Sequence, residues 1–188
     1  MSRRLKPRAL PPLILMTDSG RLAEPAALFD RLPAGAAVLL RDYDAPDRAA
    51  LAGALRAATR RHGLLLLVGG DWRLAARVDA DGLHLPEWLA RSGHRFDRAR
   101  PGWLITAAAH SRAALVAAAR AGADAALLSP VFPTRSHPDA RPLGPVRFAA
   151  LIHGAPLPVY ALGGIDGDAR RRLSACGMAG FAGISGLV

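Results

Sequence analysis

The chain has 188 residues, of which 51% are hydrophobic, so it is long enough for a single domain with a core of ordinary size. Its formal net charge of +10 raises nucleic acid as a partner. The arginines, however, are spread through most predicted helices, and their densest runs contain no interleaved aromatic stacking platform. We therefore expect a basic, solvated surface and do not expect nucleic-acid binding.

Location and domain limits follow from a few further features. The single cysteine, Cys176, cannot form an internal disulfide, which favours a reducing compartment. No apolar stretch approaches the roughly 18 residues that a membrane span needs, and the apolar run 13–16 is too short for a signal peptide. We expect a cytoplasmic protein with no membrane association, built as one domain over 1–188 with 1–11 as a flexible tail.

Short apolar runs alternate with alanine-rich amphipathic segments along the chain, a pattern typical of parallel strands covered by helices. Most of the runs are continuously apolar, as strands buried on both faces are. The predicted strands are 13–17, 37–41, 64–68, 82–85, 104–107, 125–128, 159–162 and 180–184.

The predicted helices are 24–32, 46–62, 71–78, 87–91, 111–121, 145–153 and 166–175. Asp71 and Ser111 each precede a helix, where a side-chain oxygen can accept a free amide of the first turn. Eight strands at this spacing favour a (β/α)8 TIM barrel over a doubly wound open sheet. The chain stops after the eighth strand, so we expect the barrel to lack its last helix and a homodimer to cover the side left exposed.

Glycine-rich turns follow the seventh and eighth predicted strands, at 161–165 and 183–186. Glycines there let backbone amides approach an oxyanion, and barrels commonly bind phosphate at these two turns. The segment 129–145, after the sixth strand, adds the polar side chains of Thr134, Ser136 and His137 between prolines. The sequence therefore predicts a site for the phosphate of a small molecule, although a pair of glycines alone could be only a turn.

Five segments in chain order resemble thiamine phosphate synthase and its relative, the thiazole tautomerase. They are LILMTD at 13–18, VLLRDYD at 38–44, DADGLHLPE at 79–87, the long run 108–138 that contains SPVFPTRSHP, and VYALGGI at 159–165. The resemblance covers nearly the whole chain, and an ordered series of this kind is hard to obtain by chance.

The resemblance implies a transferase of thiamine biosynthesis that joins an aminopyrimidine diphosphate to a thiazole phosphate, with release of diphosphate and with help from Mg2+. Such a protein mainly stabilises the departing diphosphate and aligns the reactants. The alternative is a protein of the same fold that has lost synthase activity. Such a protein would bind a phosphate ligand, or act on another phosphorylated heterocycle.

On the thiazole-phosphate side, the resemblance assigns roles to most of the predicted residues. Thr134 and Ser136 match the family's hydroxyl pair, Gly164 with its neighbour Gly163 matches the seventh turn, and the pair Ile184 and Ser185 matches the phosphate-binding amides of the eighth turn. His137 stands where the family has a lysine, and a histidine can still donate a hydrogen bond there. This half of the site is expected to be usable.

On the diphosphate side, most positions that the resemblance assigns carry other residues. The family's glutamine, arginine and lysine of the second-strand motif are here Leu39, Arg41 and Tyr43, and its Asn-Asp pair falls on 69–70, which is Gly-Gly. A further Mg2+-binding aspartate is here Leu89. Mg2+ needs oxygen ligands, so the usual metal site is missing.

A shifted metal site could use Asp71 or Glu87, although a helix cap and a solvated carboxylate are the simpler roles for them.

Three residues are candidates for catalysis. The catalytic histidine of the tautomerase is replaced by Pro130, which leaves His84 and His110, at the ends of the fourth and fifth strands, as acid-base groups. For each, a structural imidazole is an equal alternative. Arg41 is expected to bind an anion, and its alternative is an ion pair with a neighbouring carboxylate such as Asp42.

Overall fold

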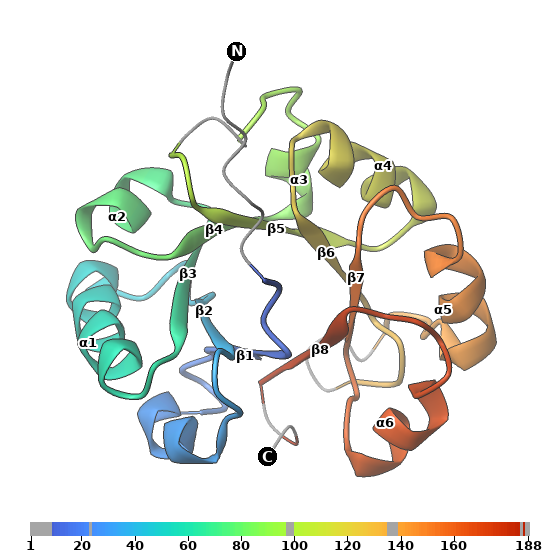
Figure 1. Ribbon diagram of the computed structural model, residues 1–188, viewed down its shortest axis with the longest axis horizontal. Coiled ribbons are helices and arrows are strands. Elements are labelled where there is room, and N and C mark those ends of the chain that lie inside the picture. The colour runs from blue at the N-terminus through green and yellow to red at the C-terminus, as the bar shows by residue number, and fades with distance from the viewer. Residues whose placement is uncertain (1–8, 23, 97–99, 135–138, 185, 187–188) are drawn as a thin grey trace.

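The strands of this protein close into a barrel. The structure is a computed structural model that describes residues 9–22, 24–96, 100–134, 139–184 and 186. The eight strands run parallel in sequence order and β8 pairs with β1 (Figure 1), which confirms the predicted (β/α)8 barrel. The strands are β1 Leu13–Met16, β2 Ala37–Leu40, β3 Leu65–Gly69, β4 Gly82–Leu85, β5 Leu104–Ala109, β6 Ala125–Leu128, β7 Val159–Leu162 and β8 Gly180–Gly183.

Helices ring the outside of the barrel in Figure 1. They are η1 Pro25–Arg31, α1 Arg48–Arg61, α2 Trp72–Arg77, α3 Glu87–Ala90, α4 Arg112–Arg120, α5 Gly144–Ile152 and α6 Gly167–Leu173. Both predicted caps are confirmed, because Asp71 accepts from the amide of Leu74 at 2.9 Å and Ser111 accepts from that of Ala114 at 3.2 Å. In the described part of the chain no helix follows β8, as predicted.

One predicted helix differs in type. The segment predicted as an α-helix over 24–32 is the 3-10 helix η1, with Pro25 in its first turn and no side-chain cap. Pro33 lies two residues beyond the end of η1, and a proline interferes with helix continuation, so the segment is confined to a short run that begins at one proline and stops before the next. Phe29 is the buried side chain of η1 and anchors it to the barrel.

Side chains of alternate strand residues point into the barrel and outward to the helices, as the two-residue period of a strand requires. Leu39 and Leu67 belong to the inner cluster, whereas their neighbours Leu40 and Leu66 belong to the outer one. Since residues 39 and 41, and likewise 67 and 69, share a face, this register directs positions 41 and 69 toward the barrel mouth. The apolar inner layer is Ile14, Met16, Ala37, Leu39, Leu67, Leu104, Ala125, Leu127, Tyr160, Ala182 and Ile184.

The amino-terminal end of the barrel is closed by a buried contact. The hydroxyl of Tyr160, on β7, donates a hydrogen bond of 2.5 Å to the carbonyl of Pro11. Gly180 fits beside it, because a Cβ there would lie 2.9 Å from the Tyr160 ring. We expect Tyr160→Phe to lower the free energy of unfolding by about 1 kcal/mol, the usual value of one hydrogen bond, in urea denaturation. A loss near zero would show that this bond does not stabilise the barrel.

No described helix is long and apolar enough to pass through a bilayer.

Candidate functional site

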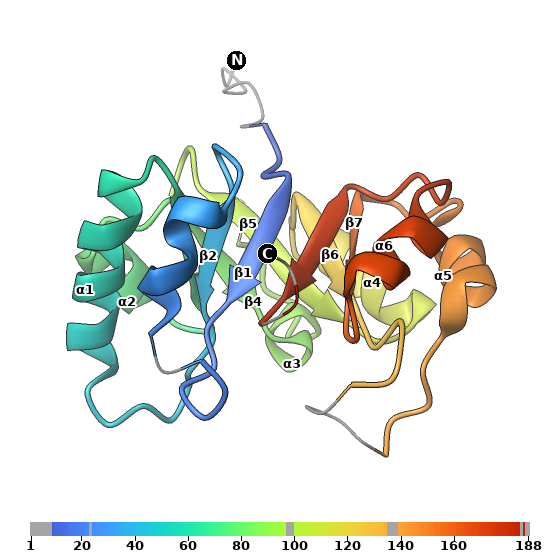
Figure 2. The ribbon, with the colours of Figure 1, turned by 90° about the horizontal axis from the view of Figure 1, so that it is seen from below.

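The carboxyl ends of the strands lie opposite the amino-terminal segment, on the side where the loop after β6 extends (Figure 2). Two adjoining cavities open there. A small one of about 50 Å³ is lined by Met16, Arg41, Ser129, Pro130, Thr134, Leu162, Gly163 and Ile184. A larger one of about 390 Å³ also contacts Thr134, Leu162, Gly163 and Ile184. Because the cavities share these residues, a ligand in the larger one would lie close to Arg41.

The seventh-strand turn is tightly packed against the loop after β6. Gly163 and Gly164 both have positive φ, at +93° and +65°. The amide of Val131 donates to the carbonyl of Leu162 at 2.9 Å, and the amide of Phe132 donates to that of Gly163 at 3.0 Å. A Cβ on Gly164 would lie 2.4 Å from the Pro133 carbonyl oxygen, so this position requires glycine.

The larger cavity combines all four of the described residues predicted to bind phosphate. Thr134, Gly163, Gly164 and Ile184 all line it. Ser136, His137 and Ser185 lie outside the described residues. The cavity also contains Arg21, a cation that the sequence reasoning missed, since nothing in its surroundings after β1 marks it as part of a site. The carboxylate of Asp166 lines the cavity too, and it accepts the Ala169 amide as the cap of α6 at 2.8 Å.

Arg41 does not pair with the carboxylate that the sequence suggested. Its guanidinium contacts Asp18 at 3.4 Å, whereas Asp42 accepts hydrogen bonds from the Thr17 hydroxyl and, at 2.6 Å, from the Ser19 amide. Burial would raise the pKa of Asp42, but these hydrogen bonds outweigh it and hold that pKa below the usual value. The carboxylate paired with Arg41 is therefore Asp18 instead of Asp42, and the missed signal was the sequence Thr-Asp-Ser directly after β1.

His84 is a fully buried imidazole inside the barrel. Its Nδ1 lies 2.9 Å from the Thr106 hydroxyl on β5, and the side chain is 2% exposed. Burial, with a further contribution from the positive charge of Arg41, lowers the pKa of His84 to about 3. The residue is therefore neutral near pH 7, and its position supports the structural alternative for this histidine.

His110 is exposed at the end of β5 and contacts a carboxylate. Its Nδ1 lies 2.7 Å from Oε2 of Glu87, while Arg91 donates to Oε1 of Glu87 at 2.8 Å. Burial raises the pKa of Glu87, but the hydrogen bonds from His110 and Arg91 dominate, and the pKa lies below its ordinary value. A carboxylate that orients one imidazole nitrogen leaves the other available for proton transfer. Glu87 is thus paired, whereas the sequence had suggested a simply solvated carboxylate.

Tyr43 packs against the two glycines that end β3. A Cβ on Gly69 would lie 3.1 Å from Cε1 of the Tyr43 ring, and one on Gly70 would lie 3.2 Å from the same atom. Arg48 holds this corner, because its guanidinium donates to the carbonyl of Gly69 at 2.6 Å and lies 5.6 Å from the centroid of the Tyr43 ring. The sequence alone identified Tyr43, Gly69 and Gly70 as departures from the family pattern. It did not predict their mutual contact, because that contact depends on the register of β2 and β3.

The residues present do not fit the Mg2+ that the family resemblance implies. No group of three or more histidine, cysteine or acidic side chains that could hold a metal is found among the described residues. The two candidates for a shifted site are already engaged, since Asp71 caps α2 and Glu87 binds His110 and Arg91. The space beside Gly69 and Gly70 is taken by the Tyr43 ring rather than by carboxylate ligands.

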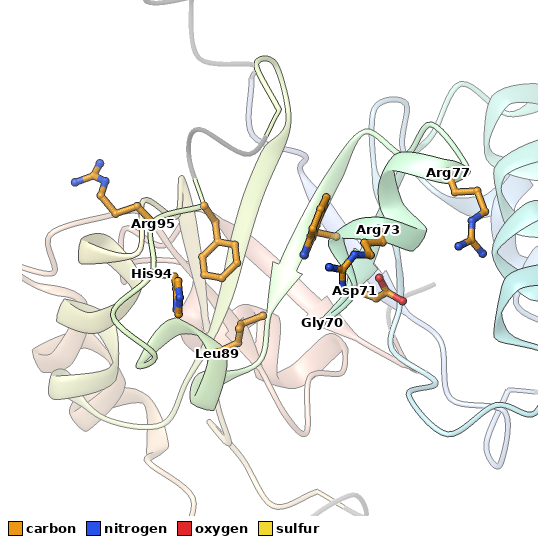
Figure 3. Close-up of a pocket in the computed structure, with 9 residues that line it drawn as sticks. Gly70, Asp71, Arg73, Arg77, Leu89, His94 and Arg95 are labelled. Atoms are coloured by element: carbon orange, nitrogen blue, oxygen red, sulfur yellow. The ribbon is translucent and has the colours of Figure 1, made fainter.

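Another cavity, of about 840 Å³, exceeds both cavities at the barrel mouth in volume and lies outside the barrel between α2 and the segment after α3 (Figure 3). Its wall includes Leu89, His94 and Phe96. The guanidinium groups of Arg77 and Arg95 lie at opposite sides of the view and do not converge on one point (Figure 3). This cavity touches the strand ends only through Gly70 and Asp71 after β3, and it contains none of the residues predicted to bind phosphate, so we assign the site to the smaller cavities at the barrel mouth.

The fold and the mouth define a (β/α)8-barrel protein with a small-molecule cavity at the carboxyl ends of its strands. The family described as thiamine monophosphate synthase matches residues 13–187, and the chain belongs to this family.

Named relatives agree with this assignment. The chain is 38% identical over 150 residues to a putative thiamine-phosphate synthase 2 of Aquifex aeolicus, covering 79% of this chain and 80% of the relative. It is 31% identical over 180 residues to a thiamine-phosphate synthase of Pyrococcus furiosus, covering 94% of this chain and 86% of that relative. The solved structure of a thiamine phosphate pyrophosphorylase from Pyrococcus furiosus superposes with a TM-score of 0.72 at 28% identity, over 92% of this chain and 85% of that one.

Proposed function

We propose that this protein binds a phosphorylated heterocycle, thiazole phosphate, at the turns after β6, β7 and β8, and that it serves thiamine biosynthesis. The observation that carries the proposal is the cavity that unites Thr134, Gly163, Gly164 and Ile184. The positive φ angles of the two glycines are the kind of backbone that presents amides to an oxyanion. Membership of the thiamine monophosphate synthase family supports the choice of thiazole phosphate as the ligand.

Thr134 tests this proposal, because its side chain lines both cavities. We expect Thr134→Val to weaken thiazole phosphate binding by about tenfold or more, since a hydrogen bond to a charged group contributes about 1.5–3 kcal/mol. Thr134→Ser keeps the hydroxyl and is the matched control, expected to bind nearly as the parent protein does. Isothermal titration calorimetry measures both, and absence of binding by the parent protein would refute the proposal.

The second candidate function is the complete coupling of thiazole phosphate to an aminopyrimidine diphosphate, with release of diphosphate. Two observations favour it: the chain belongs to the synthase family, and Arg41 lines the small cavity beside the proposed phosphate site. The assay is formation of thiamine phosphate from both substrates with and without Mg2+. Turnover that depends on Mg2+ would establish this activity, whereas ligand binding without turnover would favour the first proposal alone.

A further inference from the structure

We propose that Tyr43 determines which ligand the barrel mouth accepts. Its ring packs against Gly69 and Gly70 at the carboxyl end of β3. Because of this ring, the mouth takes a heterocycle with a single phosphate group and excludes a metal-bound diphosphate. The single-phosphate part of this inference rests on the function proposed above, whereas the exclusion of diphosphate rests on the geometry of Tyr43 itself. The exclusion of diphosphate would favour binding of thiazole phosphate alone over the complete coupling reaction.

The first support is the close fit between the ring and the backbone. Gly69 shares the inward face of β3 with Leu67, so a side chain at position 69 would point to the mouth. A Cβ there would lie 3.0 Å from the Leu40 carbonyl oxygen and 3.2 Å from the Tyr43 hydroxyl oxygen. Gly70 has a φ of +71°, and its Cβ would meet the same ring. The ring therefore takes the space that polar side chains at 69 and 70 would need.

The second support is the way in which Arg48 fixes the corner. Its guanidinium donates to three backbone carbonyl oxygens: that of Asp42 at 2.9 Å, that of Leu40 at 3.4 Å and that of Gly69 at 2.6 Å. These bonds join the end of β2 to the end of β3, and they place the same guanidinium over the Tyr43 ring. The Arg48 guanidinium thus stabilises the position of the Tyr43 ring beside β3, although this side chain is 44% exposed.

The third support is that the nearby carboxylates are already bonded. Asp42 accepts from Thr17 and Ser19, Asp18 pairs with Arg41, and Asp71 accepts from the amide of Leu74. A divalent cation that carries a diphosphate needs carboxylate oxygens to bind it. Each of these carboxylates is already engaged by at least one protein group, so a cation there would compete with existing contacts.

The experiment compares the parent protein with Tyr43→Ala and Tyr43→Phe, with inorganic diphosphate as the titrant in calorimetry. We expect Tyr43→Ala to bind diphosphate at least about tenfold more tightly, because removal of the ring opens a path for an anion to Arg41 and Arg48. Tyr43→Phe keeps the ring and should match the parent protein. Addition of Mg2+ should not strengthen diphosphate binding by any of the three proteins.

Two results would overturn the inference: equal diphosphate affinity in the parent protein and in Tyr43→Ala, or a parent affinity that Mg2+ strengthens. A parallel titration with thiazole phosphate separates this test from that of the proposed function. If thiazole phosphate fails to bind while Tyr43→Ala still gains diphosphate binding, the proposed function falls and the role of Tyr43 in excluding diphosphate stands.

A measurement of stability covers the case in which Tyr43→Ala binds poorly because its fold is perturbed. Gly69→Ala should lower the urea midpoint of the parent protein more than it lowers that of Tyr43→Ala, because the new methyl group meets the ring in only one of them. Equal shifts in the two backgrounds would show that the ring does not occupy this space, and would overturn the proposal independently of any ligand.

Discussion

Replacement of Gly164 by alanine should lower the free energy of unfolding by about 3 kcal/mol, of which roughly 1–2 kcal/mol comes from backbone strain and the rest from overpacking. The φ of Gly164 is +65°, and the new Cβ would lie 2.4 Å from the Pro133 carbonyl oxygen and 2.7 Å from Cβ of Phe132. Neither neighbour can withdraw easily, because the loop after β6 is hydrogen-bonded to the turn after β7. Equilibrium denaturation in urea measures the effect.

Gly63 offers a matched control with the same backbone angle. Its φ is also +65°, but a Cβ there would have no neighbour within 4 Å. Gly63→Ala should therefore show the backbone cost alone, about 1–2 kcal/mol. We also expect Gly164→Ala to weaken thiazole phosphate binding by about tenfold, since a displaced turn misplaces the proposed amides. Equal destabilisation of the two variants would contradict the tight packing of this turn.

The second large expected effect is a loss of stability at acidic pH, which comes from the buried side chain of His84. The pKa of His84 is about 3 in the folded protein and 6.5 when the side chain is fully solvated, so the unfolded chain binds more protons between these values. Stability from the neutral, buried imidazole is complete above about pH 6.5 and is lost as the pH falls toward 3. One extra proton bound on unfolding corresponds to a slope of about 1.4 kcal/mol per pH unit.

Urea denaturation between pH 7 and pH 4 tests this expectation on the parent protein and on His84→Gln. The variant cannot take up the proton, so its stability should fall less steeply, by up to about 1.4 kcal/mol per pH unit. Thr106→Val is the control, because it removes the hydroxyl that lies 2.9 Å from the imidazole but keeps the imidazole itself. It should be less stable at each pH with a slope close to that of the parent. Parallel curves for the parent and His84→Gln would disprove the prediction.

Much of the fold could be predicted because each buried strand is a continuous apolar run. The predicted strands 82–85, 125–128 and 159–162 coincide with β4, β6 and β7. The third strand is shifted by one residue, since the run Leu64 to Val68 does not reveal that Gly69 still pairs with His84. Helix type was harder to predict for 24–32, where two prolines limit a segment whose composition suits an α-helix.

The site was less predictable because its contacts join segments that are distant in sequence. The glycine turns after β7 and β8 are local features and could be read from the chain. The pairing of Arg41 with Asp18 and the bond from His110 to Glu87 depend on how neighbouring strands are aligned. Likewise, the substitutions at Tyr43, Gly69 and Gly70 are visible in the sequence, but only the structure shows that they are mutually complementary.

The complementarity of Tyr43 with the two glycines also limits how this site can change during evolution. A carboxylate introduced at Gly70 would meet both a left-handed backbone angle and the Tyr43 ring. Loss of the ring alone would leave an empty corner with no oxygen ligands. A metal-binding mouth therefore requires several substitutions together, because neither a carboxylate at Gly70 nor loss of the ring would supply it alone, and related chains that carry this arrangement should keep it as a unit.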